Sequence, residues 1–215
     1  IGALAPADRH VDGVVDMLLD ATQAFAQPLT TQRLWGWHAA LFPTGYSGLA
    51  PLKTNMETGG WRDDANGAMQ VVSGAIGRQT LHYEAPPAHR IAADMHTFLM
   101  WFNHTVLNLD PVIKAGLAHL WFVTIHPFED GNGRIARAVG DIVLALGDQT
   151  PQRFYSLSAQ IQRERADYYR LLERTQKGDM DVTPWLAWFI ACLGRAVAGA
   201  EQTLSEILTK AKFWE

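Results

Sequence analysis

Residues able to do chemistry are concentrated in one run of twelve, from His126 to Arg137, with the sequence His-Pro-Phe-Glu-Asp-Gly-Asn-Gly-Arg-Ile-Ala-Arg. Gly131 and Gly133 flank an asparagine, and glycine permits the positive φ that turns backbone N–H groups towards an anion. The apolar spacing after Gly133 predicts a helix, and the first N–H groups of a helix lack intrahelical partners and favour phosphate. The run therefore predicts a loop that binds phosphate oxygens.

The charged side chains of this run suit the same ligand. Arg134 and Arg137 are three residues apart, so on a helix they project from one face and can both bind phosphates. Asp130 can hold a Mg²⁺ that bridges phosphate oxygens, the usual mode of binding for this ion. His126 is the neighbour that takes up a proton near neutral pH. We therefore expect a base, a metal ligand and an anion-binding loop to lie together.

The pattern differs from two common phosphate sites. The chain contains no G-x-x-x-x-G-K-[ST], and no G-x-G-x-x-G after a strand. A simpler interpretation is that the two glycines only form a tight turn between helices and that the arginines are solvated. That interpretation does not explain why a base, a carboxylate, a glycine-rich loop and two arginines occur together in twelve residues, so we favour a polyphosphate site.

The same run matches the signature H-x-F-x-[DE]-G-N-G-R-x-x-R at every specified position, and the chain therefore resembles the Fic family. The hairpin-like segment 69–84, the following Pro86-Pro87 and Asp167-Tyr168-Tyr169 resemble the same family. The resemblance covers essentially the whole chain and implies a mostly α-helical Fic-type domain with a small β-hairpin flap. We expect an N-terminal helical region, 1–60, and a Fic domain with C-terminal helices, 61–215, that form one compact unit.

The resemblance implies a Mg²⁺-dependent adenylyltransferase, which moves AMP from ATP to a Ser, Thr or Tyr hydroxyl of a target protein or of itself. His126 would be the general base, and Asp130 would hold the Mg²⁺. Displacement would be in line at the α-phosphorus, with pyrophosphate leaving. The remaining polar positions of the motif would bind the phosphates: the amides of Gly131 and Gly133, together with Asn132, Arg134 and Arg137, the last of these at the γ-phosphate.

Other implied contacts lie outside the motif. Family members pair a target peptide with the flap, which here implies Val71 and Val72, because a strand with free backbone groups can add an extended peptide. The adenine would lie against Tyr168 and Tyr169, with Gln176 nearby. Aromatic faces suit a purine, although spacing alone places one of the tyrosines in a core.

Two other interpretations of function stay open. One is a Fic-type enzyme with other chemistry, such as removal of AMP or transfer of another nucleotide, phosphate or phosphocholine. The other is a nucleotide-binding regulatory module. Similar chains often carry an N-terminal inhibitory helix with the pattern [ST]-x-x-x-E-[GN], but no glutamate here is followed by Gly or Asn. Either that helix lies upstream of Ile1, the interpretation that we favour, or a separate partner supplies it. We expect this chain to be more active than one that includes the helix.

Composition limits the partners and the compartment. A net charge of −4 argues against a nucleic-acid partner, and from the sequence we expect neither a signal peptide nor a membrane-spanning apolar run. Cys192 is the single cysteine, so an internal disulfide is excluded and a reducing, cytoplasmic location is expected. The eight tryptophans lie mostly at helical spacing, which favours core positions or a homodimer contact.

Apolar periodicity and end signals predict a mostly helical chain. Thr30 is expected to cap one helix, and Asp110-Pro111 to begin the helix that ends at His126. The segment 53–67 shows no periodicity. The expected elements are helices over about 11–27, 31–41, 91–102, 111–125, 135–146 and 159–177, a last long helix from Thr183-Pro184, a loop at 43–51 and a hairpin at 69–84.

Overall fold

A computed structural model describes residues 9–47, 54–55, 58–65, 67–73, 78–104 and 109–213. As predicted, the described chain is mostly helical with a small antiparallel hairpin. It forms two compact units, 1–148 and 149–215. The predicted N-terminal helical region, 1–60, and Fic domain, 61–215, stay predictions.

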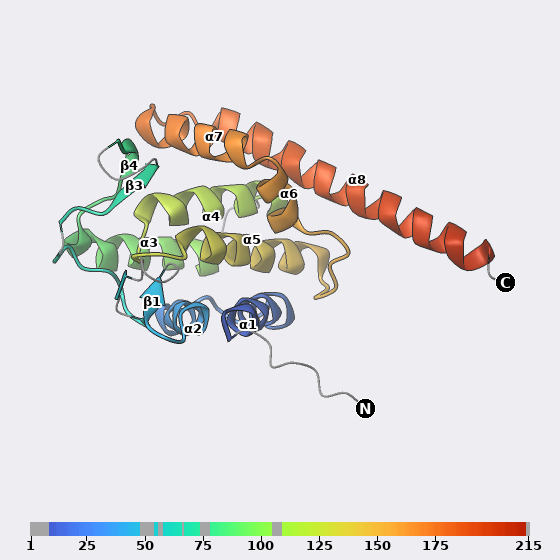
Figure 1. The fold of residues 1–215 in the computed structure, drawn as a ribbon, viewed down its shortest axis with the longest axis horizontal. Helices are drawn as coiled ribbons and strands as arrows, with labels where there is room; N and C mark the ends of the chain where they lie inside the picture. Colours follow the sequence, from blue (N-terminus) through green and yellow to red (C-terminus); the bar gives the residue numbers. More distant parts are fainter. Residues whose placement is uncertain are drawn as a thin grey trace. The chain divides into compact units, whose positions relative to one another are not determined.

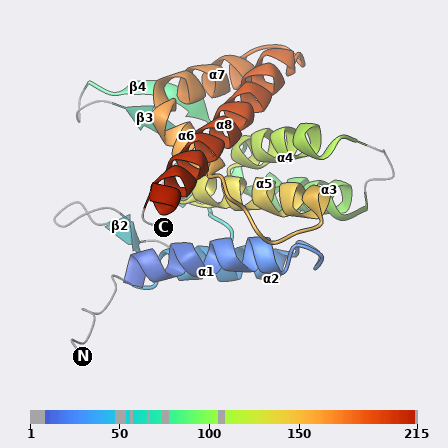
Figure 2. The same ribbon diagram turned by 90° about the vertical axis from the view of Figure 1, so that its right-hand side faces the viewer.

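The first unit is a helical bundle built around α5 (Figure 1, Figure 2). Helix α5 packs against α4 on one side and against α1 and α2 on the other, while α3 packs on α4. Small residues such as Ala136, Ala138 and Ala145 are buried along α5 and let its neighbours approach closely. The elements of this unit are α1 (Arg9–Gln23), α2 (Thr31–Leu41), β1 (Tyr46–Ser47), β2 (Thr54–Asn55), β3 (Gln70–Ser73), β4 (Thr80–Glu84), a 3₁₀ turn η1 (Ala88–Arg90), α3 (Ile91–His104), α4 (Pro111–Ile125) and α5 (Asn132–Asp148).

Capping residues fix the ends of the helices that position the motif. Asp110 Oδ1 accepts hydrogen bonds from the N–H groups of Val112 (2.8 Å) and Ile113 (3.3 Å), and Pro111 occupies the first turn. Helix α4 ends at His126, which has left-handed backbone angles, φ 52° and ψ 59°. The predicted helix that begins at Asp110-Pro111 and ends at His126 is therefore confirmed.

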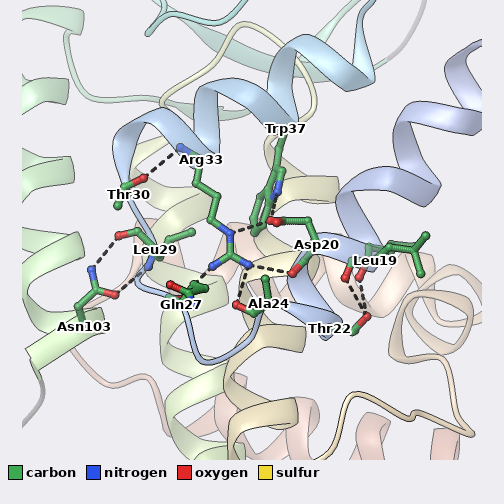
Figure 3. Close-up of polar contacts among 11 residues, drawn as sticks. Leu19, Asp20, Thr22, Ala24, Gln27, Leu29, Thr30, Arg33, Trp37 and Asn103 are labelled. Carbon is green, nitrogen blue, oxygen red and sulfur yellow. Dashed lines mark hydrogen bonds and ion pairs between the residues drawn. The ribbon is translucent and has the colours of Figure 1, made fainter.

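A polar cluster joins α1, α2 and α3 away from the motif (Figure 3). The carboxylate of Asp20 accepts hydrogen bonds from Arg33 Nε and Trp37 Nε1, each at 2.7 Å. The side-chain amide of Asn103 on α3 pairs with the backbone of Leu29: Oδ1 accepts from the Leu29 N–H at 2.9 Å, and Nδ2 donates to the Leu29 carbonyl at 2.8 Å. These contacts hold α2 and the residue before its cap against α1 and α3.

Two short antiparallel sheets complete the first unit. The predicted hairpin is confirmed: β3 pairs with β4, with a bulge between Val71 and Val72, and its turn at 74–77 lies outside the described residues. The segment 43–51, predicted as a loop, includes β1, which pairs with β2. Strands of two residues are too short to show any periodicity in the sequence.

The second unit contains α6 (Leu157–Arg163), α7 (Arg165–Lys177) and α8 (Thr183–Phe213). The prediction of one helix over 159–177 is wrong, because the chain breaks at Glu164, with φ −103° and ψ 24°. The Glu164 carboxylate accepts two hydrogen bonds from Arg195 on α8, at 2.6 and 2.5 Å. Among the described helices, α8 included, none has the length and apolar character needed to cross a membrane.

Candidate functional site

His126 is held through its backbone N–H and one of its ring nitrogens. Its N–H donates to the Phe122 carbonyl at 3.0 Å, and its Nδ1 lies 3.2 Å from the Val123 carbonyl. Because a carbonyl oxygen only accepts, we assign the proton of the neutral ring to Nδ1. Nε2 then carries the lone pair and is the basic nitrogen.

The electrostatic surroundings keep this imidazole neutral at physiological pH. Burial, with a smaller effect from the nearby Arg62 guanidinium, lowers the pKa of His126 to about 4. The Val123 carbonyl and the Asp130 carboxylate act in the opposite direction but do not prevail. His126 is therefore in the form that can accept a proton.

The side chains of Phe128 and Asn132 face inwards and stabilise the motif loop. Phe128 is fully buried and stacks on the ring of His38, with centroids 4.2 Å apart. Asn132 Oδ1 accepts from the Phe128 N–H at 3.0 Å, and Asn132 Nδ2 donates to the Phe128 carbonyl at 2.7 Å. Asn132 is only 2% exposed. Its predicted contact with phosphate therefore concerns its backbone N–H and stays a prediction.

Gly131 supplies a conformation and a close approach that other residues cannot. Its φ is +82°, and a Cβ there would lie 2.9 Å from Cε2 of the buried Phe42 and 3.4 Å from Leu41 Cδ1. Gly133, by contrast, lies in the first turn of α5 and has helical geometry. A positive φ is expected from the sequence at both glycines, but of the two only Gly131 has one.

The N-terminus of α5 is directed into the motif loop. Ile135 makes the first hydrogen bond of the helix, to the Gly131 carbonyl at 3.0 Å. The N–H groups of Asn132, Gly133 and Arg134 precede that bond and have no acceptor within the helix. Together with the helix dipole, they form an anion-binding end.

Charged side chains surround this helix end. The Arg134 guanidinium lies over the Phe42 ring, 4.7 Å from its centroid, and Arg137 follows one turn along α5. Burial lowers the pKa of Arg134, and the like charge of Arg137 lowers it further. Asp130 is exposed at the tip of the loop, and its Oδ1 accepts from the Gly131 N–H at 2.5 Å.

The donor set suits a magnesium ion shared with a substrate. Among the described residues, no cluster of three or more His, Cys, Asp or Glu side chains can hold a metal ion. Mg²⁺ is usually bound by one or two carboxylates together with substrate phosphates. A single exposed carboxylate, Asp130, beside an anion-binding helix end matches that chemistry.

Comparison with known proteins agrees with this geometry. A model of the Fic/DOC family matches residues 28–144. The chain belongs to the Fic/DOC family. It is 33% identical over 119 residues to "Protein adenylyltransferase Fic" of Nematostella vectensis, covering 52% of this chain and 25% of that protein. The relative of that name in Drosophila grimshawi is 31% identical over 131 residues, covering 59% and 26%. The chain thus spans about a quarter of the length of these curated relatives.

Solved structures show the same Fic fold. A Fic family protein from Desulfovibrio desulfuricans G20 superposes with a TM-score of 0.66 and 26% identity, over 94% of this chain and 57% of that one. A structure of Fic-1 from Caenorhabditis elegans gives a TM-score of 0.64 at 20% identity, over 97% of this chain and 56% of that one. The second likeness concerns the fold alone.

Three residues of the Fic site were not predicted from the sequence. Tyr83 on β4 donates its hydroxyl proton to the Thr124 carbonyl at 2.6 Å, and its ring centroid is 6.4 Å from that of His126. Arg62 Nε donates to the His126 carbonyl at 2.8 Å. His38 forms the surface on which Phe128 stacks. Only Arg62 left a trace in the sequence, as a charge placed directly after a tryptophan in a segment without periodicity.

The residues predicted to contact adenine all lie on α7 in the second unit. Tyr168 is buried against Trp185 and Trp188, with ring centroids 6.0 and 5.8 Å away, so it is the tyrosine at a core position. Tyr169 is 48% exposed, and Gln176 is half-buried. Their contact with a nucleotide stays a prediction.

Proposed function

We propose that this Fic domain is a protein adenylyltransferase, which transfers AMP from ATP to a Ser, Thr or Tyr hydroxyl of a target protein or of itself. The observation that carries the proposal is the placement of a neutral His126, with Nε2 as its basic nitrogen, five residues before the anion-binding end of α5 at Gly131. The curated relatives that share this domain are named protein adenylyltransferases.

The chemistry follows from the roles of these atoms. The hydroxyl oxygen of the target attacks the α-phosphorus and forms a new P–O bond, while its proton moves to Nε2 of His126. The bond from the α-phosphorus to the bridging oxygen of the β-phosphate breaks, and pyrophosphate leaves with the electron pair. A positioned base contributes about 10²–10⁴-fold to such a rate. The rest comes from orientation and charge stabilisation.

The domain supplies the charge stabilisation from α5. The N–H groups of Asn132 and Gly133 would bind the α- and β-phosphates, with Arg134 bracing them and Arg137 reaching the γ-phosphate. Asp130 would hold Mg²⁺, which when bound neutralises phosphate charge. The N–H groups, the two arginines and the bound Mg²⁺ would each stabilise negative charge that shifts towards the leaving pyrophosphate.

The β3–β4 hairpin provides a place for an extended target segment. Among the described residues β3 pairs only with β4, so its outer edge can add a strand. Val72 on β3 is 41% exposed, and Tyr83, on β4, contacts the carbonyl of Thr124 two residues before the base. We infer that Val71 and Val72 align the target hydroxyl, and that Tyr168, Tyr169 and Gln176 contact the adenine.

The test is a labelling experiment with a matched control. The purified chain is incubated with Mg²⁺ and ATP labelled at either the α- or the γ-phosphate, beside His126→Ala and His96→Ala variants, and intact masses are recorded. His96 is an exposed histidine on α3. We expect α-label only, reduced at least about 100-fold by His126→Ala and unchanged by His96→Ala.

Each other outcome supports a different function. Label from the γ-phosphate would indicate phosphate transfer, and release of AMP from a modified target would indicate the reverse reaction. ATP binding without any label would favour a regulatory module. Equal label in the His126→Ala variant would overturn the role of this residue as base.

A further inference from the structure

Arg62 lies outside the motif but donates two hydrogen bonds to the motif backbone. Its side chain is 1% exposed. Its backbone N–H donates to the Pro127 carbonyl at 3.0 Å, and its Nε donates to the His126 carbonyl at 2.8 Å. Arg62 therefore binds two successive backbone carbonyls of the motif. One of them belongs to His126, which lies 64 positions later in the chain.

The rest of the guanidinium holds the root of the β3–β4 hairpin. Arg62 Nη2 donates to the Pro86 carbonyl at 2.5 Å, and Pro86 lies two residues after the end of β4. Nη1 donates to Asp64 Oδ1 at 2.7 Å. The other carboxylate oxygen of Asp64 accepts from the Ala88 N–H at 2.6 Å. Arg62 and Asp64 thus bind the chain on both sides of Pro87, where the hairpin joins η1.

All three guanidinium nitrogens are used, and they point to separate segments of the fold. The planar fork of arginine can reach three such acceptors, whereas the single ammonium of lysine cannot do so from the same position. Burial lowers the pKa of Arg62, and the nearby Asp64 carboxylate opposes that change. Each of the three guanidinium nitrogens donates to an acceptor, which offsets the cost of burying the cation.

We propose that Arg62 is a positioning residue that couples the root of the β3–β4 hairpin to the loop of His126, so that a peptide aligned on the hairpin presents its hydroxyl to Nε2. This inference rests on the proposed function, because it assigns the hairpin to the target and His126 to the base. Tyr83, through its hydroxyl bond to Thr124, is the second link between the same two segments. With 1% of its side chain exposed, Arg62 would act through these segments and not by contact with ATP or target.

The first unit contains a matched control for a merely structural arginine. The Arg33 side chain is 11% exposed, and its guanidinium donates to the Asp20 carboxylate and to the backbone carbonyls of Asp20, Ala24 and Gln27 (Figure 3). None of these partners belongs to the β3–β4 hairpin or to the motif loop. Arg62→Lys and Arg33→Lys therefore make the same chemical change to two buried, carboxylate-paired arginines.

The two variants are compared in AMP transfer at equal folded fraction, with α-labelled ATP. We expect Arg62→Lys to lower kcat by at least about tenfold while the KM for ATP changes less than about twofold, because misplacement by about 1 Å can cost about 10²-fold. Arg33→Lys should leave both constants within about twofold of the wild type. Equal losses in the two variants, or unchanged transfer by Arg62→Lys, would overturn the proposal.

Hydrogen exchange gives a readout that does not depend on activity. Arg62→Lys should speed exchange of the amides in 80–90 and in 122–131 together, and Arg33→Lys should speed neither. Faster exchange in only one of the two segments, or in neither, would contradict the coupling. If the wild type transfers no AMP, the proposed function fails, and the exchange result still decides whether Arg62 couples the two segments.

A milder variant covers the case in which Arg62→Lys does not fold. Asp64→Asn preserves the size of the side chain but replaces one acceptor oxygen with an NH₂ donor. The amide therefore cannot accept from both Arg62 and the Ala88 N–H, as the two carboxylate oxygens do. We expect a smaller loss of kcat, about threefold to tenfold, with the same paired change in exchange. Unchanged transfer together with unchanged exchange would overturn the coupling.

Discussion

The side chain of Asn132 gives the sharpest test of how the motif loop is stabilised. Replacing Asn132 with Ala removes two hydrogen bonds to the backbone of Phe128, at 3.0 and 2.7 Å. Phe128 is fully buried, so water does not reach the N–H and C=O groups that lose their partners. The substitution therefore leaves two unsatisfied polar groups in the interior.

The structure gives both a magnitude and an internal reference. Each buried polar group left unsatisfied costs about 1–3 kcal/mol, so we expect Asn132→Ala to lower the free energy of unfolding by about 2–6 kcal/mol. Asn103 makes the same pair of bonds to the backbone of Leu29, which is also buried, but Asn103 itself is exposed and the two bonds are only partly buried, so water can approach the site once the side chain is removed (Figure 3). Asn103→Ala should therefore cost only about 1–2 kcal/mol.

The assay is urea unfolding followed by tryptophan fluorescence, with wild type, Asn132→Ala and Asn103→Ala measured side by side. Both positions lie in the unit 1–148, so the same transition reports both. AMP transfer should be lost in the first variant and kept in the second. If Asn132→Ala costs no more than Asn103→Ala and still transfers AMP, the loop does not depend on this amide, and the reasoning is wrong.

Three further predictions concern acid stability, the phosphate loop and the hairpin. Burial lowers the pKa of three histidines in the first unit: to about 4 for His38, to about 3 for His119 and to about 4 for His126. In the unfolded chain each histidine takes up a proton as the pH falls below about 6.5, whereas in the folded chain it stays neutral. The free energy of unfolding should therefore be highest above that pH and fall by about 2 kcal/mol per histidine at about pH 5. An unfolding midpoint in urea that does not change between about pH 8 and 5 would contradict this. Gly131→Ala should weaken ATP binding about tenfold in calorimetry, because of its positive φ and the Phe42 ring, whereas Gly36→Ala, where the added Cβ meets nothing within 4 Å, should not. Val72→Pro should impair protein modification more than ATP binding; an equal loss of both would indicate misfolding.

Local signals in the sequence predicted the elements that carry the site. The bounds of α2 agree with the prediction because Thr30 caps the helix through its hydroxyl, which accepts from the Arg33 N–H at 3.1 Å. The Asp110-Pro111 pair fixed the start of α4 in the same way. Capping acts over three or four residues, so a single sequence contains all the information it needs.

Contacts between distant segments could not be predicted. The bonds of Arg62 to the motif join residues 64 positions apart, and the segment that contains Arg62 has no regular structure around it. The break between α6 and α7 is similar, because Glu164 is held by Arg195, 31 positions later. In both cases the partner decides the local conformation, and apolar periodicity carries no information about it.

The signature itself combines two kinds of residue that sequence type alone does not separate. Asn132 and Phe128 face the interior, whereas Asp130 lies exposed at the loop tip. In His126, Nδ1 makes the contact with Val123 and Nε2 takes no part in it. An asparagine in a glycine loop suggests a ligand to phosphate, but its amide is already used twice by the backbone. Substitutions at the inward positions should therefore lower stability and activity together, while those at His126 or Asp130 should lower activity with little loss of stability. A residue of the signature can therefore matter for stability or for chemistry, and its burial indicates which of the two applies.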